Sequence, residues 1–493
     1  MRDLQSPVWR LVDLGHEHLR WKDCFIRHRD INPTSPAPVS REVKTEGLVS
    51  LTELEFFDEI SKQKQTLSYQ GSRFPEWQQI KQLSTSPYLS FFEHISRRSG
   101  SLCVAHDEGE IKPRALLSRW LSDQLIPAAV IGEDQREIEL EGVVWLSSPA
   151  MSPHFSAHLY QTLADLPVTR GGPLNSAIAH LMGALPAQKL NSSLGVWGIL
   201  DVGVGTASWD LLEFSQTREM FSIKSLSSYG QDWVGELGLQ RAILNTQLNE
   251  HQMAWSDLGL DQRARTLTQT RSMARFVLKR AWPKYLNAPS FGSYDQPFSG
   301  HLNEVCSLYT HGTNRAVLAW IEHSLSQNRI GLEALRGIWV TGIQGVAMIK
   351  QLRRALPSVN LRVAPRQAGL KGARNIAQSL YSVDGVMFHV EDVTSRALIL
   401  QDDYENLTRQ LWAEQTPLPI VIDTQIGATT GEVSLWLSTY GDDRIMIAKH
   451  PPISTHSHLR IYYEGPQLFE LIWVIDGIER PDQSTQWQLL GSC

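Results

Sequence analysis

The chain has 493 residues, of which 42% are hydrophobic and 20% are charged, and its formal net charge is −6. These values are ordinary for a globular protein of two to four domains. The small negative charge provides no overall attraction to nucleic acid or to an anionic membrane, so neither is indicated as a partner. No window of about eighteen apolar residues predicts a membrane helix, and the first residues lack the layout of a signal peptide.

Cysteine usage points to a reducing compartment. The four cysteines, Cys24, Cys103, Cys306 and Cys493, form no CxxC pair. This spacing argues against a zinc site and against a disulfide framework, so we expect reduced, buried thiols and a cytoplasmic location. The sixteen tryptophans are expected to serve as core or interface anchors.

The first 100 residues are polar and irregular, and the stretch 30–47, which is rich in proline and small polar residues, is expected to be a loop. Beyond it, the spacing of apolar and turn residues predicts, in chain order, a helix over 110–125, a strand over 140–150, a helix over 152–166, a turn and then a helix over 171–185, and two strands joined by a turn over 196–214.

The predicted secondary structure changes from mainly helical to mainly strand near residue 382. Residues 230–330 are predicted to be mainly helical, and residues 336–357 are predicted to form a strand, a glycine turn and a helix. After about residue 383, strand-like runs dominate, separated by clusters of Gly, Pro, Asp and Ser. Their spacing is typical of an all-β sandwich, so we place a domain boundary near 382.

The turn in the stretch DVGVGT carries the first chemical signal. Asp201 ends an apolar run, and Gly203, Gly205 and Thr206 follow it. Glycines let backbone N–H groups approach a phosphate without a Cβ in the way, and the carboxylate can hold a metal-bound water beside the same phosphate. A plain β-hairpin turn also explains the pattern, so this stretch alone leaves both interpretations open.

Two further glycine turns strengthen the phosphate interpretation. VDLG lies at residues 12–15, and VTGIQG, at residues 340–345, opens a predicted helix. Two Asp–Gly hairpins from two half-domains, together with a glycine turn for a base and ribose, are the layout of the actin-like ATPase fold. In that fold, two related subdomains clamp a nucleotide and its metal.

The order of these motifs resembles the heat-shock protein 70 (Hsp70) family over nearly the whole chain, although residues 22–100 match poorly. VDLG and DVGVGT resemble the two phosphate loops of that family, and VTGIQG resembles its adenosine loop. The other similar segments are, in order, GVVWLSSPAMSPHF, GGPLNSAIAHLMG, SSYGQDWVGELGLQRAI, VAPRQAGLKGARNIA, DGVMFHVEDVTSRAL and WAEQTPLPIVIDTQI.

The resemblance implies an α/β fold with three parts. A two-lobed, actin-like (ribonuclease H-like) nucleotide-binding domain would cover residues 1–382, an interdomain linker 383–395, and a small all-β sandwich 396–493. The helical lid of the family has no counterpart after the sandwich, so a peptide held there is expected to exchange quickly.

The resemblance also implies a site for ATP or ADP with Mg²⁺. Asp13 and Asp201 are implied as catalytic carboxylates that hold Mg²⁺ through water. Lys81 is implied either as the counterpart of the family's catalytic lysine or as an ordinary surface residue. The residues implied to bind the nucleotide are Gly15, Gly203, Gly205, Thr206, Gly230, Gly342 and Gln344.

Several positions depart from the family in a way that weakens catalysis. A carboxylate at Glu17 would repel the phosphates unless it points away, and Gly172 takes the place of a catalytic-site glutamate. The other replacements are His16 at a threonine position, Val204 and Ile343 at glycine positions, and Val346 at the position of an arginine that stacks on the base. We therefore do not expect fast hydrolysis.

Other clusters have simpler explanations. His154 and His158 lie four residues apart on a predicted helix, a spacing that can ligate zinc, but no third ligand accompanies them. The histidine-rich stretch 449–458 is expected to be a polar loop, and KQLRRALP the solvated face of a helix. The sequence contains no GxSxG or Walker A motif.

We thus expect a divergent Hsp70-like protein that binds an adenine nucleotide, hydrolyses it weakly or not at all, and acts through contacts with a protein partner or client polypeptide. One alternative is a structural subunit of a multiprotein complex that uses a nucleotide-free Hsp70 scaffold. Another is an active chaperone ATPase whose catalytic groups have moved to other positions.

Overall fold

The computed structural model describes the chain in segments. These are residues 8–14, 18–25, 46–50, 53–58, 63–68, 104–106, 109–111, 125, 129–131, 136–148, 170–186, 189–203, 205–217, 220–232, 236–253, 266, 269–270, 272–274, 276–277, 300–381, 387–392, 397–402, 407–412, 420–426, 432–438, 444–450, 457–465, 468–475 and 478–479.

The first sheet has five strands in the order β11-β10-β1-β2-β3. Its strands are β1 (Val8–Leu14), β2 (His18–Phe25), β3 (Glu46–Ser50), β10 (Leu140–Ser147) and β11 (Arg170–Asn175). The first three are antiparallel neighbours, whereas β10 runs parallel to β1 and β11 parallel to β10. The parallel strands return to the sheet only after long connections, as parallel pairing requires.

The second sheet has six strands and repeats this arrangement, in the order β16-β15-β12-β13-β14-β17. Its strands are β12 (Gly195–Val202), β13 (Thr206–Thr217), β14 (Met220–Asp232), β15 (Leu335–Thr341), β16 (Leu361–Val363) and β17 (Met387–Glu391). Strands β12, β13 and β14 are antiparallel, and β15 and β16 are parallel to β12. The two sheets therefore share the order and sense of five strands.

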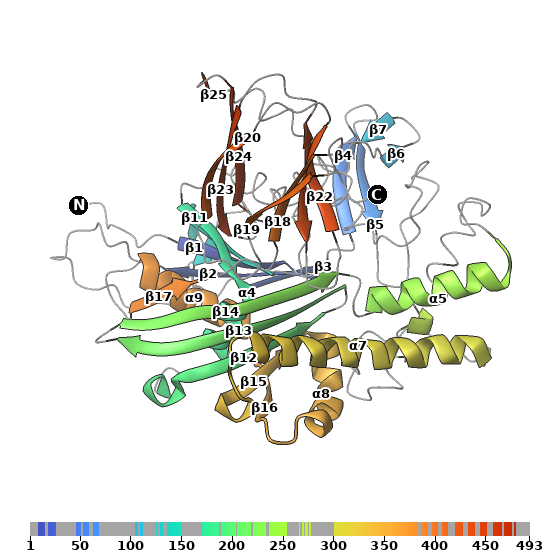
Figure 1. Ribbon diagram of the computed structural model, residues 1–493, viewed down its shortest axis with the longest axis horizontal. Coiled ribbons are helices and arrows are strands. Elements are labelled where there is room, and N and C mark those ends of the chain that lie inside the picture. The colour runs from blue at the N-terminus through green and yellow to red at the C-terminus, as the bar shows by residue number, and fades with distance from the viewer. Residues whose placement is uncertain are drawn as a thin grey trace.

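Two helices pack between the sheets (Figure 1). Helix α4 (Ser176–Ala184) and helix α9 (Ala368–Tyr381) bury side chains in one core with Trp9 of β1 and Phe214 of β13. Their backbones touch, because a Cβ on Gly372 would lie 1.7 Å from the carbonyl oxygen of Ala179 and a Cβ on Gly183 1.7 Å from that of Ala368. Glycine at both crossing points is thus a steric requirement.

A second core covers the opposite face of the second sheet. It joins Leu200, Trp209 and Val340 of the sheet to three helices, α5 (Glu236–Glu250), α7 (Gly300–Gln327) and α8 (Ile343–Ala355). The molecule is therefore layered as sheet, helix pair, sheet and helices (Figure 1). None of the helices in the described segments is both long and apolar enough to cross a membrane.

The C-terminal strands form two four-stranded antiparallel sheets. The first has the order β19-β18-β21-β22 and contains β18 (Ala397–Asp402), β19 (Leu407–Trp412), β21 (Val433–Ser438) and β22 (Arg444–His450). The second has the order β20-β23-β24-β25 and contains β20 (Ile420–Ile426), β23 (Ser457–Gly465), β24 (Leu468–Ile475) and β25 (Ile478–Glu479).

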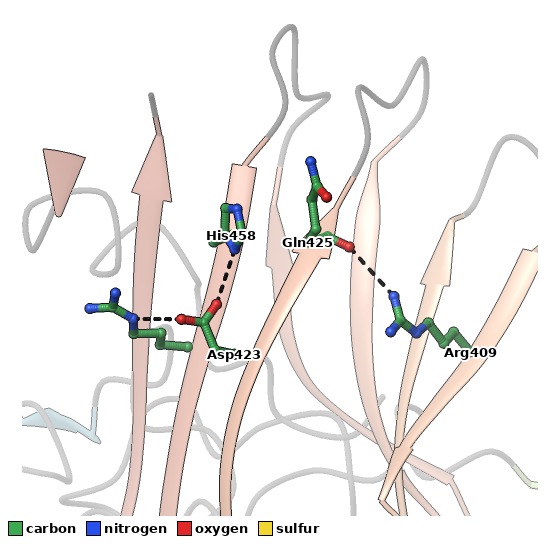
Figure 2. Close-up of polar contacts among 5 residues, drawn as sticks. Arg409, Asp423, Gln425 and His458 are labelled. Atoms are coloured by element: carbon green, nitrogen blue, oxygen red, sulfur yellow. Dashed lines mark hydrogen bonds and ion pairs between the residues drawn. The ribbon is translucent and has the colours of Figure 1, made fainter. Parts of the chain in front are cut away.

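Polar contacts line the exposed side of these C-terminal sheets (Figure 2). Arg409 Nη1 donates to the carbonyl oxygen of Gln425 at 3.4 Å and so joins β19 to β20. Asp423 lies 2.9 Å from Arg460 Nε and 3.1 Å from His458 Nδ1, and the hydrogen bonds from Arg460 and then His458 lower the pKa of Asp423. Because such exposed pairs contribute little to stability, the buried apolar faces hold the sheets.

Three short hairpins complete the described strands. They are β4 (Glu53–Asp58) with β5 (Gln63–Ser68), β6 (Val104–His106) with β7 (Gly109–Ile111), and β8 (Ala129–Ile131) with β9 (Arg136–Ile138). Short 3₁₀ turns lie at Asn191–Ser193 and Leu332–Ala334.

The expected elements over 140–150, 196–214 and 336–357 are confirmed by β10, the β12–β13 hairpin, and β15 with α8. One expectation is wrong: the segment that was expected to open with a turn at residue 171 opens instead with β11, which pairs with β10 before α4 begins. The expected linker at 383–395 contains β17, which pairs in parallel with β14. The helix expected at 152–166 lies outside the described residues. Of the helix expected at 110–125, residues 110 and 111 belong instead to strand β7, residue 125 is helical, and the rest lie outside the described residues.

Candidate functional site

Three of the predicted turns follow the strands at the middle of the two sheets. Strands β12 and β15 are parallel neighbours, and Asp201 pairs with Thr341. Because parallel neighbours end at the same edge of a sheet, the turn after Asp201 and the turn after Thr341 lie side by side. We call Asp13, residues 201–203, residues 205–206 and residues 342–344 the turn cluster.

Gly342 brings these two turns into contact. Its backbone has φ 76° and ψ 151°, a conformation that is essentially restricted to glycine. A Cβ at this position would lie 2.4 Å from Asp201 Oδ1 and 2.3 Å from the carbonyl oxygen of Val202. Gly342 is also the N-cap of α8, so the N-terminus of a helix of thirteen residues meets the Asp201 carboxylate. Unpaired N–H groups and the helix dipole make such a terminus favourable for anions.

The hairpin after Asp201 is closed by one backbone hydrogen bond. The Gly203 N–H donates to the carbonyl oxygen of Thr206 at 2.9 Å, so this N–H is already engaged. Gly203 itself is open, since the nearest atom to a Cβ there would be the Thr206 carbonyl oxygen at 3.6 Å. Gly205 is buried and Thr206 partly exposed, and these two residues are the loop's remaining candidates for binding a phosphate.

Asp13 approaches the same region from the first sheet. It lies at the end of β1, opposite Arg20 of β2, and its Oδ2 is 3.7 Å from Arg20 Nη1. Burial raises the pKa of Asp201, the charge of Asp13 raises it further, and the charges of His180 and Arg20 lower it. Charges on the first sheet and on α4 thus act on Asp201 of the second sheet.

Asp210 is a buried carboxyl group that the sequence reasoning missed. It lies on β13, fully buried, with its Oδ1 accepting a 2.6 Å hydrogen bond from Ser228 Oγ. Its Oδ2 has no partner among the described residues. Burial is the main cause that raises the pKa of Asp210 well above its usual value; the hydrogen bonds from Ser228 and Ser208 oppose this rise, and the charges of Asp392 and Asp201 add to it.

The signal for Asp210 was present in the strand pattern. Residues two apart share a face of a strand, so Ser208 and Asp210 lie on the face of β13 that continues with the buried Leu212 and Phe214. Ser208 pairs with Asp201 on the neighbouring strand. A carboxylate inside the apolar run SWDLLEF therefore belongs to the side of the sheet that carries Asp201.

His180 of α4 is a second residue that the sequence did not single out. Its Nδ1 lies 2.7 Å from the carbonyl oxygen of Ser176 and donates to it. Its ring packs against α9, where a Cβ on Gly369 would lie 3.2 Å from both Cε1 and Nε2. The ring is thus fixed by its own helix and by α9. From this position His180 lowers the pKa of Asp201.

Of the remaining predicted site residues, the structure describes Gln344 and Gly230 but not Gly15 or Lys81. Gln344 lies in the first turn of α8, is fully buried, and has no partner for either Nε2 or Oε1 among the described residues. Gly230 lies on β14 opposite Ser208, the residue of β13 that also pairs with Asp201. Gly15 and Lys81 lie outside the described residues, as do His154 and His158.

The expected linker is tied to the first sheet near these carboxyl groups. Asn175 is the N-cap of α4, where its Oδ1 accepts from the Ala177 N–H at 2.8 Å. Its Nδ2 donates to both carboxylate oxygens of Asp392, at 2.9 and 3.0 Å. Asp392 directly follows β17, so the residue that caps α4 also holds the residue at the end of β17.

A scan against models of known protein families finds no match, and a search of curated proteins finds none either. Among the described residues, no group of three or more His, Cys, Asp or Glu side chains is placed to hold a metal ion.

Proposed function

We propose that the chain is a divergent Hsp70-like protein that binds an adenine nucleotide with Mg²⁺ at the turn cluster. In this proposal residues 1–382 form an actin-like nucleotide-binding domain of two lobes, residues 383–395 the linker, and residues 396–493 a β-sandwich that contacts a protein partner or client polypeptide. ATP hydrolysis is weak or absent. A cytoplasmic location fits Cys24, which is a free, buried thiol.

The repeated sheet supports the two-lobed fold. Strands β12, β13, β14, β15 and β16 occupy in the second sheet the places that β1, β2, β3, β10 and β11 occupy in the first. The senses of the strands agree as well. Such a repeat is what two related subdomains would produce, and the helix pair α4–α9 between them supplies the shared core.

The observation that carries the proposal is the contact between Gly342 and Asp201, a carboxyl group on which the charge of Asp13 also acts. Asp13 and Asp201 end equivalent strands, β1 and β12, and the charge of Asp13 acts on Asp201. Gly342 places the N-terminus of α8 against Asp201. A polyphosphate with a divalent cation is the kind of ligand that uses carboxylates, a glycine hairpin and a helix N-terminus at the same time.

The two carboxylates, Asp13 and Asp201, fit Mg²⁺ better than they fit a metal ion whose ligands all come from the protein. Asp13 and Asp201 are both partly exposed. Mg²⁺ usually binds through one or two carboxylates and keeps several waters, with phosphates completing its octahedron. Asp13 and Asp201 would hold the ion through water, and the bound ion would neutralise charge on the phosphates.

Gln344 supports a ligand that also carries a hydrogen-bonding base. A buried amide without partners costs free energy. A ligand that offers both a donor and an acceptor, as the edge of adenine does, would satisfy its Oε1 and Nε2. Gln344 lies two residues after Gly342, close in sequence to the proposed phosphate contacts.

Hydrolysis is proposed to be weak because Gly172 stands at the position where the resemblance implies a catalytic glutamate. Gly172 lies on β11 beside Val144 and has no side chain to act on water. Asp210 is fully buried and holds its proton more tightly than an ordinary aspartate, so it is poorly suited to act as a general base.

Titration calorimetry with MgADP, MgATP and MgGTP, together with a turnover assay, tests the proposal. We expect MgADP and MgATP to bind, Asp201→Ala to abolish binding, and turnover to be far slower than that of an active chaperone ATPase. Absence of any heat at millimolar MgATP would refute nucleotide binding. Turnover at ordinary chaperone speed that disappears in Asp201→Ala would refute the weak-hydrolysis part.

A further inference from the structure

Strands β1 and β2 carry two Arg–Asp pairs that differ sharply. In the first, Arg10 Nε and Nη2 each lie 2.7 Å from an oxygen of Asp23, and Nη1 donates to the Leu125 carbonyl oxygen at 3.1 Å. Both Arg10 and Asp23 are buried, and the guanidinium stacks on Trp21 at 5.8 Å. This is a structural ion pair with every guanidinium nitrogen engaged.

The second pair has none of these properties. Arg20 Nη1 is 3.7 Å from Asp13 Oδ2, a distance too long for a hydrogen bond, and the two side chains are 38% and 29% exposed. An exposed ion pair of this kind contributes at most about 1 kcal/mol. Arg20 therefore does not hold the sheet together in the way that Arg10 does.

Arg20 nevertheless lies at the turn cluster. It is directly opposite Asp13 in the β1–β2 register, and its charge acts on Asp201 of the other sheet. His180, from α4, also lowers the pKa of Asp201. Arg20 thus places a positive charge on the first sheet that acts on Asp201 of the second.

We propose that Arg20 is the phosphate-binding cation of this site, an inference that rests on the nucleotide binding proposed above. A guanidinium has five N–H donors in a planar fork that matches two phosphate oxygens. The weak contact with Asp13 leaves this fork available. Arg20 would select nucleotides with a phosphate chain over adenosine and would counter the repulsion that Asp13 and Asp201 exert on an anion.

The test separates phosphate recognition from general damage to the site. Binding of MgADP and of adenosine is measured by calorimetry for the wild-type chain, Arg20→Gln, Arg20→Lys and the control Arg336→Gln. Arg336 is an exposed arginine at the start of β15, the end of the strand remote from Gly342, where it bonds to the Leu194 carbonyl oxygen. Circular dichroism checks that each variant is folded.

We expect Arg20→Gln to weaken MgADP at least tenfold and to leave adenosine unchanged, because only the phosphate contact is lost. Arg20→Lys keeps the charge without the fork, so its loss should be smaller, and Arg336→Gln should bind like the wild type. If Arg20→Gln does not fold, Arg20→Lys must still lose MgADP affinity but not adenosine affinity.

Three results would overturn the inference. Unchanged MgADP binding in both Arg20 variants would refute the role of Arg20 while nucleotide binding stands. Equal losses for MgADP and adenosine would show a change in the shape of the site instead of phosphate recognition. Absence of nucleotide binding by the wild-type chain would refute the proposed function and, with it, this role of Arg20.

Discussion

Gly342 lies so close to Asp201 that a Cβ on the glycine would come within 2.4 Å of the Asp201 Oδ1. The contact joins the turn after β15 to the end of β12. The positive φ of 76° makes glycine necessary for a second, independent reason. The position of the Asp201 carboxylate therefore depends on a residue 141 positions away in the chain (342 minus 201).

Gly342→Ala tests this dependence. The strained backbone and the clash with Asp201 should lower the free energy of unfolding by about 1–3 kcal/mol and should remove MgADP binding. Denaturant unfolding and calorimetry measure the two effects. The matched control is Gly312→Ala on α7, where a Cβ would have nothing within 4 Å and where alanine should add about 0.5–1 kcal/mol. Equal stability and unchanged binding in Gly342→Ala would contradict the contact.

The crossing of α4 and α9 predicts a second steric effect. A Cβ on Gly372 would lie 1.7 Å from the backbone oxygen of Ala179, and backbone atoms cannot move aside as a flexible side chain can. Gly372→Ala should therefore push the helices apart and cost about 3 kcal/mol or more, at the upper end of overpacking effects. Thermal unfolding compared with Gly312→Ala gives the measurement, and a melting temperature equal to that of the wild type would show that the helices do not cross at backbone contact.

The two Arg–Asp pairs of β1 and β2 predict opposite sensitivities. Removing Asp23 leaves the buried Arg10 guanidinium unpaired, so Asp23→Ala should cost about 3–5 kcal/mol. Asp13→Ala, on the same strand pair, should cost less than about 1 kcal/mol because its partner Arg20 is exposed. Urea unfolding of the two variants decides the matter, and similar losses in both would contradict the distinction on which the role of Arg20 depends.

Asp210 predicts a dependence of stability on pH. Its pKa is raised in the folded chain, mainly by burial, so the folded state binds its proton more tightly than the unfolded state. The stability from this group is present below the ordinary carboxyl pKa and is lost as the pH rises towards the folded value. Asp210→Asn keeps an oxygen for Ser228 and cannot ionise, so its stability should decline less between acid and neutral pH. Parallel pH profiles of unfolding for the two proteins would refute this.

The elements around the site could be predicted because each one is defined by residues close together in the sequence. The apolar run before Asp201 and the glycines after it were enough to predict the β12–β13 hairpin, and VTGIQG predicted β15, a turn and α8. The expected turn at residue 171 was wrong because the glycines there are compatible with a strand when a parallel neighbour supplies the hydrogen bonds, as β10 does.

The rest of the site depends on contacts between distant segments. Nothing in the local sequence of Arg20 separates it from Arg10, and only burial and distance show that one is structural and the other available. Asp210 and His180 reach the region of Asp201 through the packing of β13 and α4. Gly183 and Gly372 become necessary only once their helices cross.

Hydrogen–deuterium exchange with and without MgADP tests the central claim most directly, because it reports where a nucleotide binds. We expect slower exchange in peptides that cover residues 8–14, 195–206 and 335–350, which contain the turn cluster. The β-sandwich strands from Ala397 onwards should change less. Protection confined to other segments, or no protection at saturating MgADP, would contradict a nucleotide site formed by Asp13, Asp201 and Gly342.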